Sequence, residues 1–119
     1  MANLNDSLND LMSMDGALCA AVVDYSSGMM LGSVGTGVDM ELAAAGNTEV
    51  VRAKMKTMKA LGLNDNIDDI LITLGKQYHI IRPSQRLSGI FVYYVLVKSR
   101  SNLALARRKV ADVESNMSM

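Results

Sequence analysis

Two periods of apolar residues alternate along the chain, and together they predict both helices and strands. In the first half, helical spacing predicts a short helix at residues 5–13 and a long helix that Asp39 caps and that ends near Leu61. Between these helices, two short apolar runs indicate the strands of a hairpin, residues 17–23 and 29–33. The first strand is apolar on both faces, so it needs a covering layer on each side.

The second half of the chain predicts three strands and one more helix. The strands are expected at residues 67–74, 78–82 and 90–98, and Pro83 is expected to stop the second of them. The third is apolar on both faces and should therefore lie in the middle of the sheet. A helix follows at about residues 102–113.

These elements give the order αββαβββα. Short connections make neighbouring strands antiparallel, and strands buried on both faces require helices above and below the sheet. We therefore predict an α+β fold, a three-layer αβα sandwich around a five-stranded antiparallel sheet. The chain is expected to form one domain over residues 1–119, with its core at about residues 4–113 and a frayed tail at 114–119.

Charge and composition exclude several classes of partner. Lys and Arg number 12, Asp and Glu also number 12, and aromatic residues make up only 4%. A surface built for nucleic acid or anionic lipid is therefore not expected. The N-terminus lacks the pattern of a signal peptide, and the longest apolar run, residues 90–97, is too short to insert into a membrane. The single cysteine fits a reducing, cytoplasmic location.

The residues that carry catalysis or bind metals are too few and too scattered for an active site. His79, the only histidine, lies in a predicted strand, and Cys19 lies within an apolar strand, where a buried thiol is expected. Asp65, Asp68 and Asp69 lack the spacing of a calcium loop and are interpreted as a solvated loop. The glycine-rich stretch at residues 32–37 fits neither phosphate-binding pattern. We expect no catalytic activity, metal or cofactor.

Two features point to contact with a second chain. The long helix carries an apolar stripe that is wider than packing on one sheet requires. The strand at residues 67–74 is a candidate sheet edge, and free edges invite pairing with another copy. The residues expected to combine helix packing with dimer contact are Met40, Ala44, Val51, Met55 and Met58 on the helix, with Ile70 and Ile72 on the edge strand.

The chain also resembles a known family. Residues 73–83 are similar to a strand pair of bacterial roadblock/dynein light chain domains, and residues 91–98 are similar to that family's last strand. The segment Asn-Leu-Ala-Leu-Ala-Arg at 102–107 resembles the start of its last helix, and residues 16–29 resemble its opening hairpin. The likeness extends from about Leu4 to Val113, is nearest to the gliding-motility type, and implies a profilin-like fold.

The resemblance also implies a function. Members of the family form homodimers or heterodimers through the long helices and the edge strands, and many act with Ras-like small GTPases. They supply no catalytic arginine of their own, so neither Arg82 nor Arg86 is expected to act on the GTPase. Exposed basic residues of the long helix are the candidates for partner contact: Arg52, Lys56 and Lys59.

Three hypotheses follow. The first is a non-catalytic homodimer, or a heterodimer with a related chain, that scaffolds or regulates a Ras-like small GTPase. The second is a small-molecule sensor or a structural dimerisation module without a GTPase partner, and a pocket lined by convergent polar groups would favour the sensor. The third, an enzyme, has no support in the sequence.

Overall fold

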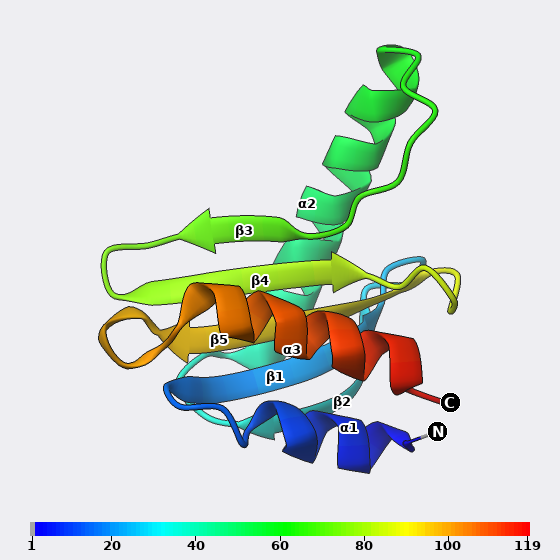
Figure 1. Ribbon diagram of the computed structural model, residues 1–119. Coiled ribbons are helices and arrows are strands. Elements are labelled where there is room, and N and C mark those ends of the chain that lie inside the picture. The colour runs from blue at the N-terminus through cyan, green and yellow to red at the C-terminus, as the bar shows by residue number, and fades with distance from the viewer. Residues whose placement is uncertain (1) are drawn as a thin grey trace.

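The computed structural model describes residues 2–119 and contains the predicted helices and strands in the predicted order (Figure 1). They are α1 (Leu4–Leu11), β1 (Ala17–Asp24), β2 (Met29–Gly35), α2 (Met40–Ala60), β3 (Ile70–Thr73), β4 (Gln77–Pro83), β5 (Ile90–Val97), the short 3₁₀ helix η1 (Lys98–Arg100) and α3 (Leu103–Asn116).

The five strands form one sheet in the order β2-β1-β5-β4-β3, and every neighbouring pair is antiparallel. The two strands that are apolar on both faces, β1 and β5, lie next to each other at the centre of this sheet. Consequently β2 and β3 are the edges, and the predicted five-stranded antiparallel sheet is confirmed.

Helices cover both faces of the sheet, which produces two separate cores. On one face, α1 and α3 pack against alternate strand residues such as Ala20, Val92 and Tyr94. On the other face, α2 packs against the intervening residues, among them Cys19 and Tyr93. The alternation along β1 and β5 therefore accounts for the predicted three-layer sandwich.

The edge strand β3 is shorter than predicted, because side chains bind the backbone just before it. The Gln85 side chain donates to the Ile67 carbonyl at 3.1 Å, and Arg82 donates to the Asp68 carbonyl at 3.2 Å. Polar groups that a strand ladder would pair are thus satisfied in another way. Only residues 70–73 pair with β4, so the prediction of a strand at residues 67–74 is wrong at both ends.

Pro83 was predicted to end the strand at Arg82. The structure corrects this, because Pro83 is itself the last residue of β4 and pairs with Phe91. Ser84 N–H donates to the Ile90 carbonyl at 2.8 Å, so even-numbered residues in this part of the chain turn their amides toward β5. The nitrogen of Pro83 therefore faces the side of β3, where pairing ends at Ile81. The missing N–H interrupts no ladder bond there.

The expected frayed tail at residues 114–119 is also corrected. Helix α3 continues to Asn116, and the side chains of Glu114 and Met117 are buried. Ser118 N–H donates to the Ala2 carbonyl at 2.8 Å, and Ala2 and Met117 form an isolated parallel bridge. The segment is ordered because Met117 fills the core beneath α1 and α3 and the Glu114 carboxylate accepts hydrogen bonds from Arg82 and Ser84.

Candidate interaction surface

Helix α2 consists of two halves with different surroundings. Its first half begins at the cap Asp39, whose carboxylate accepts from Leu42 N–H at 3.2 Å. This half buries Ala44, Thr48 and Val51 against the sheet. Beyond Val51 no residue of the helix is fully buried, and Figure 1 shows this second half extending away from the sheet beyond β3. We call residues 52–63 the overhang.

The overhang exposes more apolar surface than a monomeric helix end needs. Leu61 is 66% exposed and Leu63 is 52% exposed, on either side of Gly62, where the helix ends with a positive φ of 73°. Glycine is favoured at this position because it enters the left-handed region without strain. Clustered exposed apolar side chains of this kind are typical of interaction sites.

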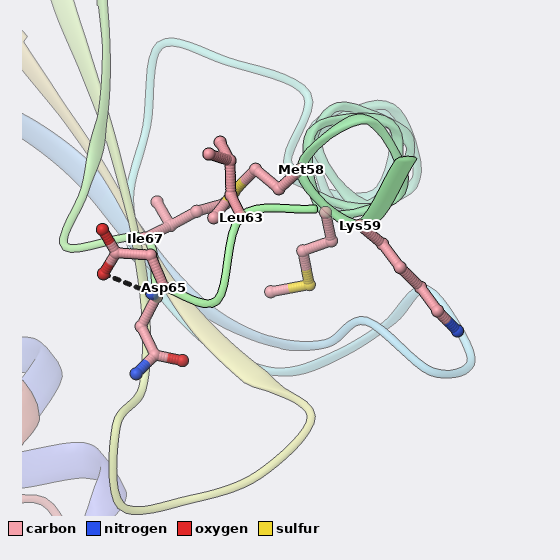
Figure 2. Close-up of a pocket in the computed structure, with 7 residues that line it drawn as sticks. Met58, Lys59, Leu63, Asp65 and Ile67 are labelled. Carbon is pink, nitrogen blue, oxygen red and sulfur yellow. Dashed lines mark hydrogen bonds between the residues drawn. The ribbon is translucent and has the colours of Figure 1, made fainter. Parts of the chain in front are cut away.

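A hollow of about 250 Å³ lies under the overhang, between α2 and the segment that leads to β3 (Figure 2). In Figure 2, Met58 and Leu63 lie near Ile67, whereas Lys59 extends away from the hollow. Asp65 lies beside them and accepts a hydrogen bond from Asn66 N–H at 2.8 Å. The hollow as a whole is lined by Met55, Met58, Lys59, Leu63, Asp65, Asn66 and Ile67.

This hollow suits a protruding side chain better than a metabolite. Its volume lies below the ~300–1,000 Å³ of most small-molecule sites. Lys59 and Asp65 are its charged residues, and Figure 2 shows no convergence of polar groups on a single point. A surface of methionine and leucine is adaptable and suits contact with another protein.

The free edge of β3 lies on the same side of the molecule as the overhang. Leu74 N–H donates to the Gln77 carbonyl at 2.9 Å, so the even-numbered residues Ile70 and Ile72 turn their amides toward β4. The amides of Leu71 and Thr73 therefore point outward from the sheet. These outward N–H groups can donate hydrogen bonds to a further strand, and the carbonyl groups of the same residues can accept hydrogen bonds from it.

A small polar cluster lies on the α2 face of the sheet next to this edge. His79, which pairs with Ile72 across the strands, has Nδ1 at 2.8 Å from the Tyr93 hydroxyl and Nε2 at 2.8 Å from the Gln77 side-chain oxygen. Burial lowers the pKa of His79, and burial raises the pKa of Tyr93, which also contacts Asn47 of α2. Neutral His79 satisfies both contacts if Nε2 donates and Nδ1 accepts.

The structure divides the predicted dimer residues into two groups. Ala44 and Val51 are 2% and 0% exposed, because they pack on their own sheet, so the expectation that they contact a second chain is corrected. The others remain half-buried at the surface: Met40 in the first turn of α2, Met55 and Met58 beside the hollow, and Ile70 and Ile72 on β3.

The basic residues proposed for partner contact are also not equivalent. Arg52 donates to the Ser26 carbonyl at 2.6 Å and lies 3.9 Å from Glu49, so it holds the β1–β2 turn against α2. Lys56 and Lys59 are exposed on the overhang. The spacing of the three residues, i, i+4 and i+7, places them along one side of the helix.

Several other residues that the sequence analysis considered as catalytic or metal-binding candidates have structural roles. Arg82 pairs with Glu114 at 3.1 Å, and Arg86 donates to the Ser115 and Met117 carbonyls at 3.0 Å each. Cys19 is fully buried as expected, and burial raises the pKa of its thiol. Asp69 is not a solvated loop residue, because Arg107 binds both its carboxylate oxygens at 2.8 and 3.0 Å.

Leu63, Asn66 and Ile67 line the hollow, yet the sequence patterns did not single them out. The available signal was the pair Leu61 and Leu63 around Gly62, because two large apolar residues at a helix end are unusual beside solvent. The remaining contacts depend on where the connection to β3 folds back, which no local pattern shows.

Comparison with solved structures decides the fold. A roadblock/LC7 domain from Streptomyces avermitilis superposes with a TM-score of 0.81, covering 96% of this chain and 93% of that chain at 12% identity. The chain has the roadblock fold. Myxococcus xanthus MglB gives a TM-score of 0.82 at 18% identity, over 93% of this chain and 88% of that one. The resemblance first seen in the sequence is thus confirmed for the fold.

Another MglB structure, described as having a tetrameric arrangement, superposes with a TM-score of 0.70 at 13% identity, over 93% of this chain and 87% of that chain. No protein-family model matches the chain, and no curated protein sequence matches it. The superpositions establish a shared roadblock fold. Because the identities are this low, the partner has to be argued from the surface of the protein.

Two kinds of feature are missing from residues 2–119. No helix there is both long and apolar enough to cross a membrane. Within the same residues, no three side chains of His, Cys, Asp or Glu are grouped closely enough to hold a metal ion.

Proposed function

We propose that this chain is a non-catalytic, single-domain, cytoplasmic homodimer that scaffolds or regulates a Ras-like small GTPase. The observation that carries the proposal is the overhang of α2 beyond the free edge of β3. An overhanging helix with Leu61 and Leu63 exposed leaves apolar surface that a second copy can cover.

The geometry supports a twofold arrangement through β3. A second β3 strand would bond to the outward amides of Leu71 and Thr73 and would extend the sheet beneath the overhang. The half-buried residues Met55, Met58, Ile70 and Ile72 would then become buried. Likeness to roadblock structures, one of them with a tetrameric arrangement, supports self-association in general terms.

A substitution on the edge tests the dimer. Thr73→Pro removes one outward N–H and places a ring on the free edge, where proline is tolerated by the monomer. We expect sedimentation velocity at micromolar concentration to show a dimer for the wild type and a monomer for Thr73→Pro, with unchanged far-UV circular dichroism. Thr73→Val, which keeps the N–H, should remain dimeric. A monomeric wild type would overturn the dimer, and a dimeric Thr73→Pro variant would overturn its pairing through β3.

The GTPase partner needs a separate experiment. Lys56 and Lys59 offer exposed positive charge on the overhang, which suits an acidic surface on the partner. The tagged protein should recover a Ras-like small GTPase from its host, identified by mass spectrometry. The double charge reversal Lys56→Glu and Lys59→Glu should lose it, whereas Arg108→Glu on α3 should not. Recovery of no GTPase would favour the alternative, a sensing or purely structural dimerisation module.

A further inference from the structure

The electrically neutral chain has a strongly uneven charge distribution. All 12 lysines and arginines lie after residue 51, whereas seven of the 12 acidic residues lie before it. The segment without basic residues forms α1, β1, β2 and the first half of α2. The β2 edge is therefore built from acidic and neutral residues, and basic residues that reach this part of the molecule come from later elements, Arg52 beside Ser26 and Lys109 paired with Asp10.

Strand β2 is the longer of the two free edges. It has seven residues, and Met29 and Leu31 are 65% and 40% exposed. Thr36 N–H donates to the Leu18 carbonyl at 3.1 Å, and Val34 pairs with Ala20, so the amides of Ser33 and Gly35 point outward from the sheet.

Devices that normally protect an edge are few on this strand. Lysine and proline, which discourage strand pairing, are both missing from Met29–Gly35. One bulge occurs, where the register shifts between Val22 and Val23 and leaves Leu31 unpaired. Residues 32–35 pair in unbroken register with β1 after the bulge, but Gly35 has a positive φ of 82°, so residues 32–34 are the part that keeps the extended geometry a further strand requires.

A hollow of about 300 Å³ lies between the start of β2 and the first turns of α2, lined by Gly28, Met29, Met30, Glu41 and Ala44. Lysine and arginine combine a long apolar stem with a charged head. The two methionines suit such a stem, and the Glu41 carboxylate suits the head. Nearby, hydrogen bonds from the Ser26 hydroxyl and amide lower the pKa of Asp24, which pairs with Met29.

A second copy of this chain is a poor occupant of this surface. Twofold pairing of β2 with itself would bring Glu41 and Asp24 toward their own equivalents, and like charges oppose such contact. One cation near Asp24, Arg52, is already bound to the Ser26 carbonyl and lies beside Glu49. The charge on this edge therefore favours a basic segment from another protein.

We propose that β2 and the first turns of α2 form a docking surface for an extended segment that bears lysine or arginine. The segment adds to the sheet along residues 32–34 and places one basic side chain in the hollow beside Glu41. This mode of binding takes its affinity from backbone hydrogen bonds and its specificity from side-chain pockets. The surface is on the opposite edge from β3, so the proposal does not depend on the proposed dimer or GTPase.

A pair of matched peptides tests the proposal. The probe is the extended peptide Lys-Val-Lys-Val-Thr-Val-Lys, and its control carries glutamate in place of each lysine. Backbone amide NMR of the full chain should show shifts confined to β2 and the first turns of α2 on adding the lysine peptide. Fluorescence anisotropy should show that the glutamate peptide binds at least ~10-fold more weakly than the lysine peptide. Added salt should weaken the binding of the lysine peptide.

Variants of the protein separate the two parts of the surface. Ser33→Pro removes an outward N–H and should abolish binding, whereas Ser33→Thr should retain it. Glu41→Lys should weaken binding by about tenfold or more, and Glu41→Gln by less. Circular dichroism confirms that each variant is folded. Equal binding of both peptides, shifts at β3 in place of β2, or no shifts at β2 would each overturn the proposal.

Discussion

The two edges of the sheet are held in place in different ways. Strand β3 has only four residues, and side chains anchor its start: Arg107 binds Asp69, and Arg82 binds the Asp68 carbonyl. Strand β2 has seven residues and is held through two glycines that allow close contact. Leu4 and Leu8 pack directly on Gly32, and the Leu18 backbone lies against Gly35. One edge thus depends on added polar contacts and the other on close backbone approach.

This difference suggests distinct uses for the two edges. The polar anchors hold β3 under the overhang of α2, where a second copy can extend the sheet. The glycines let α1 and the β1 backbone approach β2 closely, and the outer edge of β2 stays open. Variants that damage one edge should therefore leave the other largely intact, which the following predictions test.

The largest effect is expected at Gly35 on β2. Its φ is +82°, and a Cβ there would lie 2.1 Å from the Leu18 carbonyl oxygen and 2.8 Å from Cys19 Cα. Strain and overpacking together should make Gly35→Ala lose about 4 kcal/mol of unfolding free energy in urea denaturation. Gly75 lies in the β3–β4 turn, where an added Cβ would meet no heavy atom within 4 Å apart from its chain neighbours. Gly75→Ala should therefore change the unfolding free energy by less than ~0.5 kcal/mol. Equal effects of the two substitutions would contradict this account of β2.

The next effect is expected from the buried ion pair that supports β3. Glu114 is 1% exposed and accepts from Arg82 at 3.1 Å and from the Ser84 hydroxyl at 3.0 Å. Glu114→Ala leaves the Arg82 guanidinium without its carboxylate, and we expect a loss of about 3 kcal/mol of unfolding free energy. Hydrogen exchange should also show faster opening of β3 than of β2. The control Asp112→Ala, at an exposed position of the same helix, should have little effect, and a comparable loss there would refute the assignment.

The smallest effect is a pH dependence confined to the β3 side, where the chain's only histidine lies. Burial lowers the pKa of His79 below its ordinary value of 6.5, so the unfolded chain binds a proton more readily than the folded chain. The stabilisation is complete above pH 6.5 and is lost as pH falls from there toward the folded pKa. Urea midpoints between about pH 7 and about pH 5 should fall less steeply for His79→Gln than for the wild type. Identical slopes would exclude His79 as the titrating group.

Much of this fold could be predicted, because the central strands have an unambiguous pattern. Apolar residues on both faces of β1 and β5 required two covering layers, and the structure places helices on both faces. Asp39 also caps α2 as its residue type suggests. These features depend on local sequence, so they could be deduced without coordinates.

Other features could not be deduced, because they depend on contacts between distant segments. The length of β3 is set by Arg82 and Gln85, which come from later in the chain. The ordered conformation of the last residues depends on the ion pair between Arg82 and Glu114, which lie 32 positions apart in the sequence. Helical spacing placed Ala44 and Val51 on the same stripe as Met55 and Met58, yet the sheet ends before the helix does, so only the first pair is buried.

The central seam of the sheet has a consequence for how the chain folds. β1 with β2, β3 with β4, and β4 with β5 are hairpins of neighbouring segments, whereas β1 and β5 join residues as distant as Ala21 and Tyr93. Closing a loop of roughly 70 residues is slow compared with forming a hairpin. We therefore expect each edge to form with its own hairpin, and the β1–β5 seam to be the rate-limiting step that joins two preformed halves.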